Sequence, residues 1–196
     1  MRLVRHLIGL AVLIALLVPA GANAATFNFF STVGLGPSGG AGTGGPATSY
    51  PSSIEVAGLG GPLTKVTATI IDFGSGVPDD VDMLLVGPEG EQVMLMSDAC
   101  GEAQFFDNDT WTFDDDAPTL LSDSGPCASN QAASFKPSNY VGGAPEPDQF
   151  GVGGSVFPPF ASTLSAFAGT DPNGPWDLYV LDITKGRSAS KSPAGR

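Results

Sequence analysis

Five aspartates offer the clearest chemistry in this 196-residue chain. Three precede an apolar run and two follow in a later acidic segment: Asp79, Asp80, Asp82, Asp107 and Asp109. Hard oxygen ligands drawn from several loops suit Ca²⁺, which accepts carboxylates and backbone carbonyls, whereas close carboxylates without a cation repel one another. The spacing does not match an EF-hand loop, which needs a central Gly and a terminal Glu. We therefore expect either a Ca²⁺ site at these residues or a solvated acidic face.

The chain has two cysteines, Cys100 and Cys127, on either side of a segment that contains Trp111. In an oxidising compartment they predict one disulfide within the chain. A ring of this size contributes roughly 3–4 kcal/mol in the chain-entropy model. A zinc site would need more ligands than two thiolates provide.

The single histidine, His6, lies in the N-terminal leader, so the chain that follows the leader has none. This excludes a Ser-His-Asp triad, a Cys-His pair and histidine-ligated zinc or iron from residues 25–196. The Gly-rich stretch Gly34–Gly45 lacks the Gly-Lys-[Ser/Thr] of a phosphate-binding loop. The enzyme class that stays open is a secreted hydrolase, glycosidase-like, with a carboxylate pair, for which Trp111 beside Asp109 is the one hint.

Residues 1–24 have the pattern of a signal peptide. A basic start with Arg2 and Arg5 precedes the apolar run Leu7–Val18, and Ala22-Asn23-Ala24 forms a cleavage signal. The apolar run is short for a membrane span. We expect a secreted, extracellular protein that begins at Ala25 and has no membrane span after the leader is removed.

Negative charge dominates the body of the chain. The 20 Asp and Glu residues all lie between leader and tail with only Lys65 and Lys136, which gives a formal charge of 2 − 20 = −18. Such a surface repels nucleic acid and anionic membranes and attracts cations. Solubility in an extracellular medium explains the same composition.

Short apolar runs separated by Gly and Pro predict strands. Met83–Val86 and Val93–Met96 flank Gly-Pro-Glu-Gly and predict a hairpin, and alternation predicts strands over Leu63–Phe73 and Trp176–Asp182. In the first of these alternating runs Val66, Ala68 and Ile70 share one face. Thr110–Phe113 should place Trp111 and Phe113 inward. With no stretch of helical periodicity after the leader, the pattern favours an all-β, antiparallel sandwich.

The remaining stretches divide the chain. Residues 25–53 predict one strand, Thr26–Ser31, and a Gly/Pro/Ser-rich connector from residue 34 with little structure of its own. Residues 54–184 form the sandwich, in which the long loop 122–159 is held by the aromatic residues Phe135, Tyr140 and Phe150. Residues 185–196 are a basic tail without bulky apolar residues, which we expect to be disordered.

Two of these stretches resemble the P domain (P/Homo B domain) of the kexin and furin family of subtilisin-like proteases. They are D-M-L-L-V-G-P-E-G at residues 82–90 and N-G-P-W-D-L-Y-V-L-D at residues 173–182. The resemblance, which spans roughly Ile54 to Asp182, implies a jelly roll of the galactose-binding-domain-like class. It also implies a proprotein-convertase-like relative whose catalytic domain is separate, and this chain has none of that domain's residues.

These features predict a secreted, non-catalytic module with a binding or accessory role and an unknown protein or carbohydrate partner. A mechanical surface or matrix component, with Ca²⁺ stiffening its loops, is the alternative that shares this fold. P domains end on a further apolar strand after the W-x-L-x-V-x-D element, and the tail here has no equivalent. We therefore expect the sandwich to lack its final strand and to self-associate through an open sheet edge.

Overall fold

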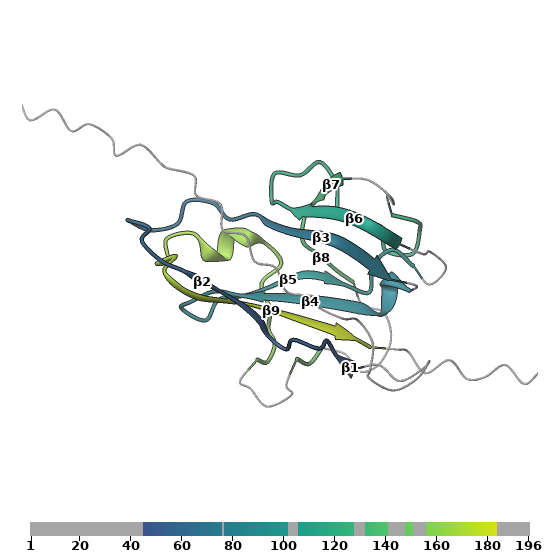
Figure 1. The fold of residues 1–196 in the computed structure, drawn as a ribbon. Coiled ribbons are helices and arrows are strands. Elements are labelled where there is room, and N and C mark those ends of the chain that lie inside the picture. Colours follow the sequence, from purple (N-terminus) through teal and green to yellow (C-terminus); the bar gives the residue numbers. More distant parts are fainter. Residues whose placement is uncertain are drawn as a thin grey trace, which may run out of the picture.

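Two β-sheets face each other across an apolar core in the computed structural model, which describes residues 45–75, 77–101, 106–127, 132–140, 148–150 and 156–183 (Figure 1). The larger sheet has the order β1-β9-β4-β5-β8, and β2 also pairs with β9. Its strands are β1 (Gly45–Pro46), β2 (Ser52–Val56), β4 (Val81–Val86), β5 (Gln92–Ser97), β8 (Ser138–Asn139) and β9 (Gly174–Asp182). The smaller sheet comprises β3 (Ala68–Ser75), β6 (Phe106–Phe113) and β7 (Ala132–Phe135).

The predicted hairpin forms the centre of the larger sheet. Strands β4 and β5 pair antiparallel, and the turn between them closes with a 2.9 Å hydrogen bond from the Gly87 N–H to the Glu91 carbonyl. β4 also pairs antiparallel with β9, with Met83 opposite Val180. The two stretches that resemble a P domain are therefore neighbouring strands.

The all-β sandwich is confirmed, but the expectation of purely antiparallel sheets is wrong. β5 pairs with β8 in parallel, and β6 pairs with β7 in parallel. Both exceptions come from the stretch between residues 132 and 139, which the sequence analysis treated as loop. Its two strands are short, at four and two residues, and therefore lack the length over which a period-two pattern becomes visible.

Aromatic side chains fill the space between the sheets. Trp111 and Phe113 are fully buried, as the alternation of β6 predicted. The Trp111 ring has its centroid 5.0 Å from that of Phe73 and 5.5 Å from that of Phe135, so all three strands of the smaller sheet contribute to one cluster. At one end of the sandwich lies the 3₁₀ turn η2 (Leu164–Phe167), where Phe167 packs on Trp176 (Figure 1).

A second, smaller core covers the outer face of the larger sheet. Its buried members are Leu84, Met94, Phe150 and Val156. The β4 run M-L-L-V has apolar residues facing both ways, so Leu84 enters this core while Met83 and Leu85 enter the first. Phe150 comes from the long loop, which confirms the prediction that aromatic residues hold that loop in place.

The stretch expected to be a connector is partly wrong. Gly45 and Pro46 pair with Asp182 and Leu181, and β2 begins at Ser52, so the expected boundary at residue 53 falls inside a strand. Ala47 is buried beside Val180. Sheet pairing here depends on backbone groups and small side chains, which carry no apolar pattern. The leader, the strand at Thr26–Ser31 and the tail 185–196 lie outside the described residues.

Sheet edges can be located within the described part of the chain. β9, the last strand described, is not an edge, because β4 lies on one side of it and β1 and β2 lie on the other. In the smaller sheet β3 pairs with β6 alone. Ile71 on β3 is 59% exposed. The lack of a final strand and self-association through an open edge stay predictions.

Candidate functional site

The five predicted ligands are not gathered at one place. Asp79 and Asp80 lie in the 3₁₀ turn η1 (Pro78–Asp80), Asp82 lies on β4, and Asp109 lies on β6 of the opposite sheet. Asp107 is in β6 as well, but its side chain lies outside the described residues. All four described carboxylates are buried, which excludes the simple alternative of a solvated acidic face for them.

Asp82 and Asp109 face different cores. Asp109 has the same parity on β6 as Trp111 and Phe113 and is fully buried with them between the sheets. Asp82 has the parity of Leu84 on β4, so it faces the outer core. The sequence allowed for a Ca²⁺ site that includes both Asp82 and Asp109. The structure places these two residues in different cores, so they do not share a site.

A β-bulge brings a polar partner to the face of Asp82. The pairing of β4 with β5 slips between Met83–Met96 and Leu84–Met94, so β5 has one extra residue at Leu95. Leu95 and Met96 consequently both enter the core between the sheets. After the bulge Ser97 faces outward, toward the same side as Asp82.

Two further aspartates complete the cluster, and the sequence analysis proposed neither as a ligand. The Ser97 hydroxyl donates a 2.6 Å hydrogen bond to Asp148 Oδ2 and lies 3.3 Å from Asp98 Oδ2. Asp98 and Asp148 are both buried and close enough to Asp82 to raise its pKa. We call Asp82, Ser97, Asp98 and Asp148 the outer acidic cluster.

The backbone fixes Asp98 at the end of β5. Its φ of 49° is left-handed, a conformation that Asp tolerates better than most residues. Two residues later the Cys100–Cys127 disulfide confirms the predicted pairing, and the Cys100 N–H donates a 2.7 Å hydrogen bond to the Ser122 carbonyl. Gly101 must be glycine, because a Cβ there would lie 2.7 Å from the Ser124 carbonyl oxygen. The sequence feature that could have pointed to Asp98 is its position directly after the buried strand β5.

Burial dominates the electrostatics of Asp82. Loss of solvent is the largest cause, and together with the charges of Asp148 and Asp98 it raises the pKa of Asp82 to about 9. The Ser97 hydroxyl and the Asp98 backbone N–H offset part of this shift, although neither oxygen of Asp82 makes a hydrogen bond of ordinary geometry with a described residue. The surroundings of Asp82 therefore disfavour its charged form.

Three consecutive aspartates after β6 have structural partners. Lys65 Nζ lies 2.8 Å from Asp114 Oδ1 and 2.7 Å from Asp116 Oδ2. The Asp115 carboxylate accepts 2.8 Å hydrogen bonds from the backbone N–H groups of Leu164 and Ser165 and so anchors η2. This run of three aspartates therefore joins separate segments of the fold.

The hint of a glycosidase site is not supported. Trp111 and Asp109 are both fully buried, so a sugar in solution could not reach them. A carboxylate pair for glycoside hydrolysis must flank a substrate bond in an open cleft. Neither residue offers such a cleft.

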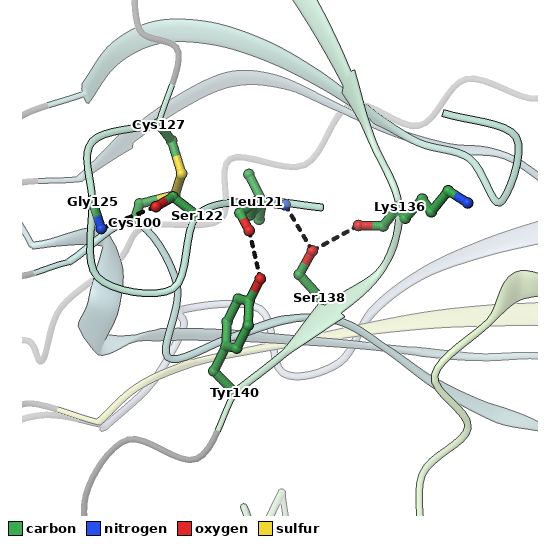
Figure 2. The surroundings of a disulfide bond; sticks show 8 residues. All are labelled: Cys100, Leu121, Ser122, Gly125, Cys127, Lys136, Ser138 and Tyr140. Carbon is green, nitrogen blue, oxygen red and sulfur yellow. Dashed lines mark hydrogen bonds between the residues drawn. A yellow bond between two sulfur atoms is a disulfide. The ribbon is translucent and has the colours of Figure 1, made fainter. Parts of the chain in front are cut away.

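A surface hollow of about 340 Å³ lies over the segment beside the disulfide. Its lining includes Leu120, Lys136 and Tyr140. Figure 2 shows how this segment is held: the Tyr140 hydroxyl donates to the Leu121 carbonyl at 2.7 Å, and the Leu121 N–H donates to the Ser138 hydroxyl at 2.9 Å. Leu121 is thus hydrogen-bonded through both its N–H and its carbonyl to Ser138 and Tyr140, which line the hollow.

Among the described residues, no three His, Cys, Asp or Glu side chains already converge on one point as metal ligands. No family model, curated protein or solved structure matches the chain. In the described ranges no helix is long and apolar enough to cross a membrane. The outer acidic cluster and the surface hollow are therefore the features from which function has to be argued.

Proposed function

We propose that this protein is a secreted, non-catalytic β-sandwich module of the P/Homo B type, with a binding or accessory role. What supports the proposal is that the two stretches resembling a P domain form paired neighbouring strands, with Met83 opposite Val180. Strands chosen by chance from a sandwich need not be adjacent. Within the proposal the sandwich is a jelly roll of the galactose-binding-domain-like class.

The residue inventory supports the non-catalytic part of the proposal. Residues 25–196 contain no histidine, so the triad of the subtilisin-like proteases cannot form within them. The one observation that favoured a glycosidase-like hydrolase no longer supports it, because Asp109 and Trp111 are both inaccessible to a substrate. Any family association with serine proteases would thus describe a separate catalytic domain.

The non-catalytic part is tested with the purified protein. A fluorophosphonate probe should leave it unlabelled, and chromogenic glycosides should release no nitrophenol above the buffer rate. Subtilisin and a retaining glycosidase serve as positive controls. Stoichiometric labelling, or glycoside turnover that is lost in Asp109→Asn, would overturn the proposal.

The export part is tested by intact-mass measurement of the protein recovered from the culture medium. The expected mass is that of a chain beginning at Ala25 with two hydrogens fewer than the reduced form, because the disulfide is closed. A protein that retains residues 1–24, or that stays in the cytoplasm, would contradict secretion.

The surface hollow favours a binding role over a purely mechanical one. It combines an exposed apolar residue, Leu120, with a cation, Lys136, and the ring of Tyr140. A glycan array and an array of extracellular peptides test it directly, with Leu120→Ser as the variant that should weaken binding. If neither array yields a ligand that responds to Leu120→Ser, the mechanical alternative is preferred.

A further inference from the structure

Asp82 lacks the partners that a buried carboxylate requires. The residue is fully buried, and neither Oδ atom makes a hydrogen bond of ordinary geometry with a described residue. Only the Ser97 hydroxyl and the Asp98 backbone N–H lie close enough to favour its charged form. An ionised carboxylate in such a position costs several kcal/mol unless a cation or several donors compensate it.

The neighbours of Asp82 add negative charge and few hydrogen-bond donors. Asp98 and Asp148 are 1% and 6% exposed, and both lie close enough to Asp82 for their negative charges to repel its charged form. The Ser97 hydroxyl lies close to both of these carboxylates but has a single proton, and its shorter bond is to Asp148. The cluster therefore contains three carboxylates and few donors.

No described lysine neutralises the cluster. Lys65 pairs with Asp114 and Asp116, which are not members of the outer acidic cluster. Lys136 is exposed beside the surface hollow. These two are the only basic residues in the described ranges. No described cation therefore balances the charge of the cluster when its carboxylates are ionised.

We propose that the outer acidic cluster binds one Ca²⁺ ion, with Asp82, Asp98 and Asp148 as carboxylate ligands and the Ser97 hydroxyl as a further oxygen. An all-oxygen ligand set selects hard cations and disfavours zinc, which prefers nitrogen and sulfur. Mg²⁺ demands a strict octahedron and keeps its waters, which suits a buried cluster poorly. This inference is independent of the proposed role as a P-type module.

The ligands lie on three separate segments, and their side chains must turn toward a common point to hold an ion. Asp82 is held by β4, whereas Asp98 follows the end of β5 and Asp148 belongs to the loop segment 148–150. The carboxylates have not converged on one point, so binding requires rotation of the Asp98 and Asp148 side chains toward Asp82. Ca²⁺ accepts irregular coordination of this kind.

The ion would fasten the long loop onto the larger sheet. Asp148 stands two residues before Phe150, which is buried against Leu84 and Met94 in the outer core. The Tyr50 hydroxyl already donates a 2.8 Å hydrogen bond to the Phe150 carbonyl. A Ca²⁺ ligand at Asp148 would hold the other side of the same segment and stabilise the cover over the outer core.

The test compares the melting temperature of the purified protein in EDTA, in millimolar Ca²⁺ and in millimolar Mg²⁺. Binding to the folded state alone should raise it by about 5–10 °C at a hundredfold excess of Ca²⁺ over Kd, and Mg²⁺ should do much less. Titration calorimetry should give a stoichiometry of one. Excitation of tyrosine should sensitise luminescence from Tb³⁺ used in place of Ca²⁺, because the Tyr50 ring lies near enough to Asp82 for their charges to interact.

Asp82→Asn should abolish the Ca²⁺-dependent shift while leaving a folded protein in EDTA, because the amide keeps the shape and removes the buried charge. Asp148→Asn provides a second variant with the same expected loss. The matched control is Asp123→Asn, which removes one exposed charge and should retain the full shift. An equal Ca²⁺ shift in Asp82→Asn, or no shift in the original protein, would overturn the site.

A competing source of positive charge is the tail of the same chain, which contains Lys185 and Arg187. If these residues neutralise the cluster, Lys185→Gln with Arg187→Gln should lower the melting temperature of the original protein but not that of Asp82→Asn. Ca²⁺ would then have no effect on the original protein. That combination of results would also overturn the Ca²⁺ site.

Discussion

The rings of Phe73 and Trp111 pack with their centroids 5.0 Å apart, although Phe73 is out of step with Val66, Ala68 and Ile70. Ile70 pairs with Trp111 and Phe73 pairs with Asp109, so β3 has one residue more than β6 between these two pairs. A β-bulge absorbs the extra residue. The bulge exposes Ile71 and turns Phe73 into the core.

Asp72 lies in this bulge with a φ of 57°, in the left-handed region that favours glycine. We therefore expect Asp72→Gly to leave the free energy of unfolding unchanged or to raise it by up to about 1 kcal/mol. Asp72→Val should lower it by about 1–2 kcal/mol, because a β-branched residue resists this conformation. Urea unfolding of the two variants measures the difference.

Thr69 provides the matched control for Asp72. It is also exposed on β3, but its backbone is not left-handed. At Thr69 the order should reverse, so that Gly destabilises more than Val. The same order of stability at both positions would show that the backbone conformation of Asp72 does not determine its effect.

The pKa of Asp114 should respond to Lys65. The Lys65 side chain is the main cause that holds the pKa of this carboxyl below its ordinary value, and the Asp116 backbone N–H contributes. Because the folded pKa is lowered, the stabilisation is present above the unfolded value near 4. It is lost as the pH falls through the folded value. Since the pair is largely exposed, its effect on total stability should be small.

Side-chain NMR titration of Asp114 measures this directly. Lys65→Ala should move its pKa up toward the ordinary value. Lys136→Ala should leave it unchanged, because Lys136, although near in the fold, is not among the groups that lower the pKa of Asp114. An Asp114 pKa that does not respond to Lys65→Ala would mean that the ion pair does not persist in solution.

The sequence predicted the strands that have a clear apolar period, and it failed where that period breaks. The hairpin, the inward Trp111 and Phe113, and the disulfide were all predicted correctly. The bulges at Leu95 and Asp72 each insert one residue, which reverses the facing of every later residue in the strand. Such a bulge has no reliable mark in a single sequence.

The candidate site was predicted only in part for the same reason. Asp82 was identified because it begins an apolar strand. Its neighbour Ser97 faces it only after the Leu95 bulge, and Asp148 reaches it from a distant loop rich in Pro and Gly. Asp109 was grouped with Asp82 because both lie in acidic stretches, but strand parity places them in different cores.

Leu84 tests the outer core. It is fully buried on the outer face of β4 against Phe150 and Met94. Leu84→Ala should lower the free energy of unfolding by about 2–5 kcal/mol, because it removes buried methyl groups and leaves a cavity. Leu120→Ala is the control, since Leu120 is 50% exposed and should change stability by less than about 0.5 kcal/mol. A similar small effect for Leu84→Ala would mean that the loop does not cover this face in solution.

The disulfide between Cys100 and Cys127 should contribute roughly 3–4 kcal/mol to stability, because it closes a loop over a sequence separation of 27 and thereby restricts the unfolded chain. The double variant Cys100→Ala with Cys127→Ala avoids placing new polar groups at these two buried positions. Its urea unfolding should show this loss together with a larger m-value, since an unlinked chain exposes more surface when it unfolds.

The original protein under reducing conditions is the control for the double variant and should match it within about 1 kcal/mol, with the same m-value. Native hydrogen exchange should then quicken at the Cys100 N–H, whose 2.7 Å bond to the Ser122 carbonyl lies beside the bridge. Exchange at the Leu85 N–H in the centre of β4 should change only as far as global stability changes. A double variant as stable as the oxidised protein, or one with an unchanged m-value, would show that the cross-link does not act through the unfolded chain.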